Sequence, residues 1–511
     1  MRGNERILIS MVEQSGRKKP NIVLILSDDL SLRDLGCYNQ KLIDTPNIDA
    51  LAREGVLCTD AYSAAPVCGP SRCCLLTGKH MGHATIRDNC VRVKDGMYQV
   101  QLNEDEKTIG DILRQAGYTT ASIGKWAVGL EGGNATPDKK GFDYSYGFLD
   151  QNYAHTFYPE YLYENGKRVD IPENRGFDMT KRYRYNSLRY DETAEFENVY
   201  NSDGELVIDE LPDKKGKNSY LLCEDKAIEF ISENKEQPFF LYYCVQNPHG
   251  PLIVPNLLQY KDADFPSLKH KEWAAVVTML DNGVGRIVDC LKRDGRYDDT
   301  LFVFASDNGY SAWGYFGISR DDEVTFFNHK GEFRGSKFSL NGEAGCRIPL
   351  IFSWKNAVAH RESIQYPCGL IDLMATFADA AGAVPPDTDG VSLLPMLADG
   401  ASPQREYMYF EYLRAQAIRT GRYKAYRPFA AAETEVYDVI SDSYEKNDVS
   451  SERPDVVRLA ETAFSAEHVA SPLFINPGES EKAFDRKCAR RRLQPNCFAA
   501  NAAYHKKSPL E

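Results

Sequence analysis

A cysteine, a proline and an arginine in one short segment carry most of the chemistry visible in this sequence. Cys68 opens the string CGPSRCCLLTGK (68–79). Pro70 suits the first position of a helix, because no backbone N–H is needed there. A cysteine just before it lies near the helix N-terminus, where unpaired N–H groups and the helix dipole favour negative charge. Arg72 adds a fixed cation with a planar donor fork. The segment predicts a nucleophile that faces an anionic substrate.

Two apolar segments, 21–30 and 301–310, each carry a pair of oxygen-bearing side chains near their ends: Asp28, Asp29, Asp307 and Asn308. Continuous apolar runs of this kind are typical of central parallel strands, and ligands bind beyond the carboxyl ends of such strands. Three Asp and one Asn favour Ca²⁺ or Mg²⁺ over zinc. The alternative is that these side chains only cap helices or form turns.

The string from Cys68 to Lys79 resembles the sulfatase signature C-x-P-S-R-x-x-L-x-T-G-[KR] and matches it at every defined position. The alternative, a buried structural cysteine, suits a lone cysteine better than a twelve-residue match. In the arylsulfatase-like type I members of this family the cysteine is oxidised to formylglycine, whose hydrate is the nucleophile. The resemblance therefore implies a maturation enzyme that generates formylglycine at Cys68. It also implies a metal, usually Ca²⁺ with Mg²⁺ as the alternative, held by modified Cys68 and the four residues Asp28, Asp29, Asp307 and Asn308.

The segment SIGKWAVGL (122–130) resembles the sulfatase stretch G-K-W-H-L-G, whose lysine contacts the sulfate. Lys125 takes the lysine position, and Ala127 stands where the family has histidine. His155, in QNYAHTFYP (151–159), is the candidate substitute. Its segment resembles H-A-H-N-Y-Y-P of a bacterial subgroup that also lacks histidine after G-K-W. The alternative for His155 is a packed loop residue.

Two further segments resemble the family's active-site stretches. FFLYYCVQNPHGPLIVP (239–255) resembles a strand followed by P-H-x-P, and its His249 has a near-neutral intrinsic pKa suited to binding sulfate or protonating the leaving oxygen. FRGSKFSLNGEAGCRIPLIF (333–352) resembles R-G-x-K-x-x-L-x-E-G-G-x-R-x-P-x-I, with one extra residue in the middle and Lys337 at the active-site lysine. The alternatives are a histidine that caps a strand and a solvated lysine.

The resemblance implies catalytic roles for Cys68, Arg72, Lys125, His155, His249 and Lys337, and substrate contacts for Lys125, His249, Lys337 and Arg87. Fixed cations and a divalent metal suit sulfate transfer because they stabilise charge on the non-bridging oxygens. Thr77, Lys79 and the segment 82–89 are expected to shape the same edge of the sheet. For Arg87, a structural ion pair is an equal alternative.

The elements that must position these residues alternate along the chain. Helix-like amphipathic segments at 45–55, 108–117, 220–235 and 272–295 are interspersed with apolar strand-like segments. This alternation predicts an α/β protein with a doubly wound, mostly parallel sheet. The resemblance implies the alkaline-phosphatase-like version of it, a large mostly parallel mixed sheet flanked by helices. It also implies a smaller C-terminal α+β subdomain, carried by QAIRTGRYKAYRP and TEVYDVISDSYEKNDV.

We expect four parts along the chain: an N-terminal extension (1–20), a catalytic domain (21–400), a C-terminal subdomain with a small antiparallel sheet (401–480) and a basic tail (481–511). Within the catalytic domain, residues 131–220 are rich in Gly, Asn, Tyr and Asp. This composition predicts an insertion over the active edge, where substrate specificity would lie.

The composition, 42% hydrophobic and 26% charged over 511 residues, is that of a globular protein. A net charge of −13 makes nonspecific nucleic-acid binding unexpected, and no apolar run predicts a membrane span. We recognise no secretory signal, and the thirteen cysteines show no zinc-type pairs. These features predict free thiols and a cytoplasmic location.

The leading hypothesis is a sulfatase that hydrolyses the sulfate ester of a sulfated carbohydrate or related small molecule. A phosphonate monoester or phosphodiester hydrolase of the same superfamily is the alternative among enzymes, since it shares the cysteine signature and the metal-binding acids. An inactive protein that binds sulfated glycans is the third hypothesis, motivated only by Ala127. The sugar, the sulfate position and the oligomeric state stay open.

Overall fold

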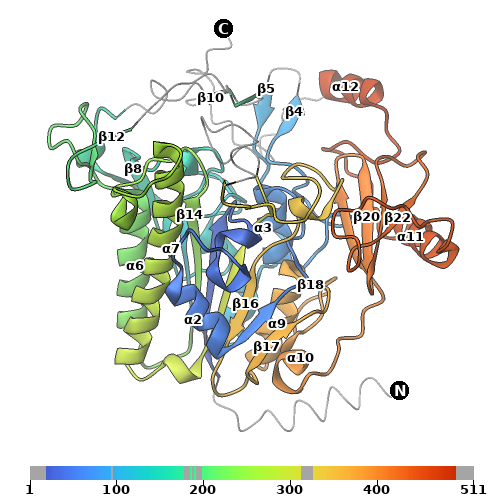
Figure 1. Cartoon of the computed structure of the whole chain (residues 1–511), viewed down its shortest axis with the longest axis horizontal. Coiled ribbons are helices and arrows are strands. Elements are labelled where there is room, and N and C mark those ends of the chain that lie inside the picture. Colours follow the sequence, from blue (N-terminus) through green and yellow to red (C-terminus); the bar gives the residue numbers. More distant parts are fainter. Residues whose placement is uncertain are drawn as a thin grey trace.

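The computed structural model describes residues 19–93, 96–177, 185–186, 189–190, 198–311 and 326–490. A ten-stranded mixed sheet with helices on both faces forms the centre of the molecule, and a four-stranded sheet stands beside it (Figure 1). In spatial order the strands of the large sheet are β17 (Arg361–Ile364), β2 (Val56–Cys58), β16 (Leu350–Ser353), β15 (Thr300–Ser306), β1 (Asn21–Asp28), β14 (Phe239–Pro248), β6 (Thr119–Lys125), β7 (Tyr144–Phe148), β8 (Tyr161–Glu164) and β9 (Lys167–Asp170).

The five central strands, β15, β1, β14, β6 and β7, pair in parallel. Antiparallel pairs flank them, β15 with β16 on one side and β7 with β8 on the other. Every residue of β1 and β15 is buried, because helices cover both faces of this part of the sheet. The α/β architecture expected from the alternating segments is therefore confirmed.

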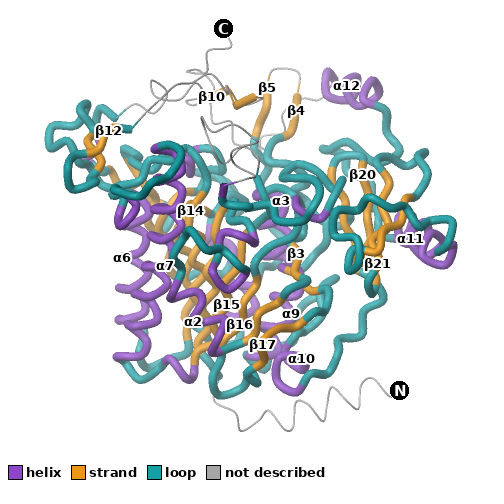
Figure 2. The backbone as a smooth tube through the Cα atoms, viewed as in Figure 1, coloured by secondary structure: helices purple, strands orange, loops and turns teal. Residues whose placement is uncertain are grey.

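Successive side chains of β1 enter two different cores, as the pleat of a strand requires. Ile22, Leu24 and Leu26 pack with residues of α3 (Cys68–Thr77), α4 (Ile109–Gln115) and α9 (Leu373–Ala380). Val23 and Ile25 pack with residues of α2 (Pro46–Glu54), α6 (Ser219–Glu233) and α7 (Leu268–Arg293). Figure 2 shows α6 and α7 side by side along one side of the sheet.

The expected C-terminal antiparallel sheet is present. It consists of β19 (Met408–Tyr412), β20 (Ala415–Thr420), β21 (Tyr423–Arg427) and β22 (Glu435–Asp438). The helix α11 (Pro454–Ala466) packs on it through a core that includes Ile418, Ala425 and Val436. The beginning of the expected basic tail forms α12 (Glu481–Arg490), which lies against β4 (Val91–Val93); residues 491–511 lie outside the described part.

The segment 131–220 differs from the expected insertion, because part of it belongs to the large sheet. β7 pairs in parallel with β6, and β8 and β9 extend the sheet antiparallel to its edge. Aromatic residues in YSYGF (144–148) make β7 a strand that packs on the core, which its polar surroundings in the sequence obscured. Residues 178–184, 187–188 and 191–197 of this segment lie outside the described residues, as do residues 1–18 of the expected extension.

Short elements complete the described part: β3 (Ala61–Tyr62) with β18 (Cys368–Gly369), β4 with β5 (Gly96–Tyr98), β10 (Tyr185–Asn186) with β11 (Arg189–Tyr190), β12 (Val199–Tyr200) with β13 (Leu206–Val207), and the helix α10 (Leu394–Asp399). Within the described residues every cysteine is free. No helix there combines the length and the apolar character needed to cross a membrane.

Candidate active site

The ends of β1 and β15 bring the two acid-rich segments together. The strands pair in parallel with Ser27 opposite Ser306, so both chains leave the sheet at the same edge. Directly after β1 the backbone turns at Asp29, whose φ of 63° lies in the left-handed region that Asp tolerates better than most residues. Asn308 then donates a hydrogen bond of 2.7 Å from its Nδ2 to Asp29 Oδ1. The predicted clustering of the two pairs is present.

The helix α3 delivers the cysteine and the arginine to this edge. It begins at Cys68, two residues earlier than the position of Pro70 suggested, so Cys68 is itself the first helical residue. Pro70 still lies in the first turn, where a backbone N–H has no helical acceptor. Arg72, one turn further on, donates from Nε to Asp307 Oδ2 at 2.9 Å and from Nη1 to the Lys125 carbonyl at 2.9 Å. It is fully buried.

The two lysines identified in the sequence approach the acids from opposite ends of the chain. Lys125, the last residue of β6, lies with Nζ 2.5 Å from Asp28 Oδ2. Lys337 lies with Nζ 2.5 Å from Asp29 Oδ1. Both side chains are almost fully buried, so neither is the solvated surface lysine that was the alternative.

The two candidate histidines lie together at the same site. The rings of His155 and His249 stack with centroids 3.9 Å apart and an interplanar angle of 9°. His155 Nε2 is 3.3 Å from Lys125 Nζ, and His249 Nε2 is 3.5 Å from Asp29 Oδ2. Burial lowers the pKa of both histidines, with the pKa of His155 well below its ordinary value. Burial thus favours the neutral form of both rings.

Asp28, Asp29, Asp307 and Asn308 form a group that we call the acid cluster. The oxygen atoms of its side chains suit a divalent cation. Among the described residues no donor reaches Asp28 Oδ1 or Asn308 Oδ1, although both oxygens are buried. Ligand atoms of Asp28, Asp307 and Cys68 lie within 4.8 Å of one another. Buried acceptor oxygens without donors are costly unless a cation or donor satisfies them. Carboxylate and amide oxygens in this number suit Ca²⁺ or Mg²⁺.

The charges at the site explain how three carboxylates tolerate burial. Burial alone would raise the pKa of Asp28, but the neighbouring cations, Lys125 foremost, hold it below its ordinary value. The pKa of Asp29 is also held below its ordinary value, mainly by the charge of Lys337. Burial and the charge of Asp28 raise the pKa of Asp307 to about 6 in spite of Arg72. One carboxylate is thus left without enough positive charge, which a divalent cation would supply.

Arg87 occupies a different place from the other predicted residues. It donates to the carbonyls of Gly82 (2.7 Å) and Ala84 (3.0 Å), and its third contact is with Glu411 Oε1 at 3.2 Å. Glu411 belongs to β19, so Arg87 links the active-site segment to the C-terminal sheet. These contacts are the structural ion pair that the sequence left open as the alternative to a substrate contact.

Two neutral amides beside the cysteine were not singled out in the sequence. Gln151 lies with Nε2 2.9 Å from Cys68 Sγ. Asn89 lies with Nδ2 3.6 Å from the same atom, and its Oδ1 accepts the Gly69 N–H at 2.9 Å. Both belong to segments already noted, 151–159 and 82–89. The residue types of these two amides did not indicate a place in the site, because uncharged amides are also common in turns.

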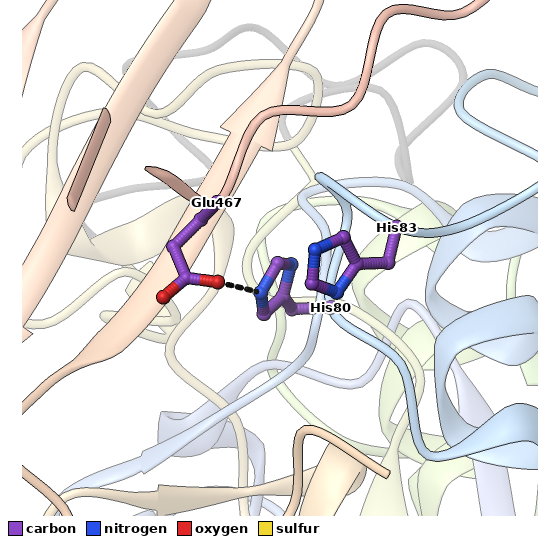
Figure 3. A group of neighbouring side chains, drawn as sticks. All are labelled: His80, His83 and Glu467. Atoms are coloured by element: carbon purple, nitrogen blue, oxygen red, sulfur yellow. Dashed lines mark hydrogen bonds and ion pairs between the residues drawn. The ribbon is translucent and has the colours of Figure 1, made fainter. Parts of the chain in front are cut away.

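A second group of metal-type ligands lies away from this site. Figure 3 shows the His80 and His83 rings side by side, with Glu467 on the far side of His80. His80 Nδ1 accepts the Gly82 N–H at 3.1 Å, so its Nε2 carries the proton and donates to Glu467 Oε2 at 3.0 Å. His83 Nδ1 lies 2.9 Å from Asp389 Oδ2. Both nitrogens of His80 are therefore hydrogen-bonded. The group connects the loop that follows α3 to the C-terminal end of α11.

We expect the His83→Gln variant to lower the melting temperature more at about pH 5.5 than at about pH 8.5. The hydrogen bond with Asp389 raises the pKa of His83 above its ordinary 6.5. Its charged form therefore stabilises the fold fully below that ordinary value, and this stabilisation is lost as pH rises through the raised value. At high pH, glutamine can replace the neutral hydrogen bond. Thermal unfolding at both pH values measures the difference, about 1 kcal/mol for a partly exposed pair. Equal losses at both pH values would contradict a charged His83.

Comparisons with known proteins agree with this geometry. The sequence profile of the sulfatase family matches residues 20–383. The profile described as "N-sulphoglucosamine sulphohydrolase, C-terminal" matches residues 336–462. An N-acetylgalactosamine-6-O-sulfatase of Bacteroides thetaiotaomicron is 29% identical over 480 residues, which covers 86% of this chain and 91% of that protein.

Solved structures share the fold over nearly the whole chain. A structure titled "Crystal structure of Ps i-CgsB in complex with k-i-k-neocarrahexaose" has a TM-score of 0.69 at 26% identity and covers 93% of this chain and 98% of its own. A phosphonate monoester hydrolase of Agrobacterium radiobacter has a TM-score of 0.60 at 18% identity and covers 87% of this chain and 95% of its own. At that identity the second likeness shows the fold alone. The family match spans most of the chain and includes every predicted residue of the acid cluster; the chain belongs to the sulfatase family and is a sulfuric ester hydrolase of the arylsulfatase-like kind.

Proposed function

We propose that this sulfatase removes sulfate from a sulfated carbohydrate, with 6-O-sulfated N-acetylhexosamines as the first substrates to test. The reaction would use a formylglycine hydrate derived from Cys68 and a divalent cation, Ca²⁺ before Mg²⁺, at the acid cluster. The observation that carries the proposal is the convergence of three carboxylates, two buried lysines and Arg72 on the N-terminus of α3. The choice of sugar is supported by the name of the 29% identical bacterial relative.

Formylglycine, once formed, supplies a hydroxyl nucleophile and a second hydroxyl through which the aldehyde can be recovered. The residues of this chain hold the sulfate against it. Lys125 and Lys337 supply fixed positive charge for the non-bridging oxygens, where negative charge increases in the transition state. Their burial strengthens this effect, because water screens charges less in the protein interior than at the surface.

The stacked histidines are suited to the proton that the leaving alcohol needs. Burial favours the neutral form of both rings, because it lowers their pKa values. A bound sulfate ester adds negative charge nearby, which raises the pKa of an adjacent imidazole. We infer that His249 or His155 takes up a proton when substrate binds and gives it to the leaving oxygen. The pair would serve in place of the histidine absent at Ala127.

The test uses full-length protein produced together with a formylglycine-generating enzyme. The mass of the peptide that contains Cys68 reports the conversion, and sulfate release is measured on the 6-sulfates of N-acetylgalactosamine and N-acetylglucosamine. A phosphonate monoester and a phosphodiester are assayed in parallel. We expect an aldehyde at position 68, turnover of the sulfated sugars, loss of activity with a chelator and recovery with Ca²⁺.

An unmodified Cys68 in protein that was exposed to the maturation enzyme would contradict the proposed nucleophile. Faster turnover of the phosphonate monoester than of any sulfate ester would favour the phosphonate hydrolase as the physiological activity. The inactive glycan-binding hypothesis predicts binding of the sulfated sugars without sulfate release. It has little support, since both lysines and all four cation-binding residues of the acid cluster are retained.

A further inference from the structure

We propose that the side-chain amide of Gln151 holds both hydroxyls of the hydrate at position 68, donating to one oxygen and accepting from the other. The inference rests on the proposed function, because it concerns the modified form of Cys68. It assigns to an uncharged residue the task of fixing the hydrate in a chain that has Ala127 where the family carries histidine.

The position of Gln151 is fixed by contacts that lead back to Ala127. Gln151 is 1% exposed and lies in the turn that follows β7. Its backbone N–H donates to Gln99 Oε1 at 2.8 Å, and Gln99 Nε2 donates to the Ala127 carbonyl at 3.0 Å. The two glutamines thus connect the backbone at position 127 to the first residue of α3.

The separation between Gln151 and Cys68 suits an oxygen atom better than a sulfur atom. Gln151 Nε2 lies 2.9 Å from Cys68 Sγ, which is the usual distance for an N–H···O bond. Sulfur is larger than oxygen and holds an N–H donor further away, as Asn89 Nδ2 does at 3.6 Å. The contact with Cys68 Sγ is therefore short for a sulfur acceptor, and the amide is close enough to donate to a hydroxyl oxygen at this position.

Within the described part of the chain, the oxygen of the Gln151 amide has no hydrogen-bond donor. Among the described residues nothing donates to Gln151 Oε1, although this oxygen is buried. A buried acceptor left without a partner carries a desolvation cost. A hydrate has two O–H groups, whereas a thiol has a single weak donor. Rotating the amide by half a turn exchanges its donor and acceptor and leaves the same pairing with two hydroxyls.

This pairing has two measurable consequences. First, it orients the hydrate, so its loss slows turnover without abolishing it. Second, it stabilises the hydrate relative to the free aldehyde, so its loss increases the fraction that reacts with an oxime-forming reagent. Because an amide does not titrate, the shape of the pH–rate profile stays unchanged. An acid–base role would move that profile.

The experiment compares matured wild-type protein with Gln151→Met, which keeps the length of the side chain and removes the amide. Methoxyamine labelling at position 68, followed by peptide mass, gives the rate of oxime formation in native protein. Labelling in urea gives the total aldehyde. For Gln151→Met we expect kcat about tenfold to a hundredfold lower, because both hydrogen bonds to the hydrate are lost. We also expect oxime formation several-fold faster in native protein and equal in urea.

Two further variants make the result specific. Gln151→Glu can accept from both hydroxyls, so its native oxime formation should stay slow, although its charge lowers kcat. Gln416→Leu removes another buried glutamine, one that donates to Tyr409 and Phe464 in the C-terminal subdomain. It should lower the melting temperature and leave both rates unchanged. If Gln151→Met does not fold, fast native labelling of Gln151→Glu overturns the proposal.

The outcomes separate this inference from the proposed function. Equal aldehyde in wild type and Gln151→Met, with equal kcat and equal native oxime formation, overturns the role of Gln151 and leaves the proposed function intact. Absence of aldehyde from matured wild-type protein overturns the proposed function and the pairing together. A slower kcat accompanied by a shifted pH–rate profile also overturns the pairing, because it would indicate a proton-transfer role.

Discussion

The Cys68→Ala variant is expected to release sulfate at least about 10⁴-fold more slowly than the matured enzyme, a loss typical for removal of a nucleophile. Alanine can neither be oxidised to an aldehyde nor attack sulfur. The fixed cations Lys125, Lys337 and Arg72 remain, so binding of a sulfated sugar should persist. Sulfate release and calorimetric binding of the same sugar measure the two quantities.

The matched control for this variant is Cys74→Ala, which removes a fully buried cysteine of the same helix. It should lower the melting temperature and retain kcat. Binding and turnover that both survive in Cys68→Ala would contradict the assignment of the nucleophile. Binding without turnover in the matured wild type as well would favour the inactive glycan-binding hypothesis.

The Lys125→Met and Lys337→Met variants are each expected to lower kcat/KM about 10²- to 10³-fold, the range for loss of one group that stabilises transition-state charge. Methionine keeps the length of the side chain and removes the charge. Each substitution also removes the lysine nearest to an aspartate, Lys125 at 2.5 Å from Asp28 or Lys337 at 2.5 Å from Asp29. Steady-state kinetics with saturating Ca²⁺ separate the effect on substrate from any change in cation binding.

Lys140 offers a control of the same kind. It is a buried lysine whose Nζ donates to the carbonyls of Asn103, Glu104 and Glu106, away from the acid cluster. Lys140→Met should lower the melting temperature and leave kcat/KM within about twofold of wild type. A similar fall in kcat/KM for all three variants would show that the effect comes from lost stability rather than from charge at the sulfate.

Local sequence was sufficient to predict the position of residues whose chemistry and placement both follow from one short segment. Cys68 and Arg72 lie four residues apart at the start of one helix, so their spacing puts them on one face. Asp28 and Asp307 follow apolar runs that read as central strands, and parallel strands end at a shared edge. The alternation of apolar and amphipathic segments likewise predicted the main sheet and its flanking helices, whereas the C-terminal antiparallel sheet was expected from the resemblance to the sulfatase family.

Two other predictions failed, one because a local signal allows more than one helix start and one because strand pairing outweighs local composition. The proline at position 70 pointed to a helix start two residues too late, since a first turn tolerates proline at more than one place. The polar, glycine-rich composition around YSYGF (144–148) concealed β7, because its place in the sheet depends on pairing with β6 rather than on its own pattern.

The sequence alone pointed to the segment that begins at Cys68 and to the acid pairs, because each is a short pattern whose residues have distinctive chemistry. It pointed to the two lysines through stretches that resemble those of the sulfatase family. Only the tertiary structure decided which neutral groups surround them. Gln151 meets Cys68 across 83 residues of sequence, and Arg87 turns to Glu411 across 324. Such contacts depend on how separate strands and loops pack, and an amide or a lone arginine carries no local signal of its distant partner.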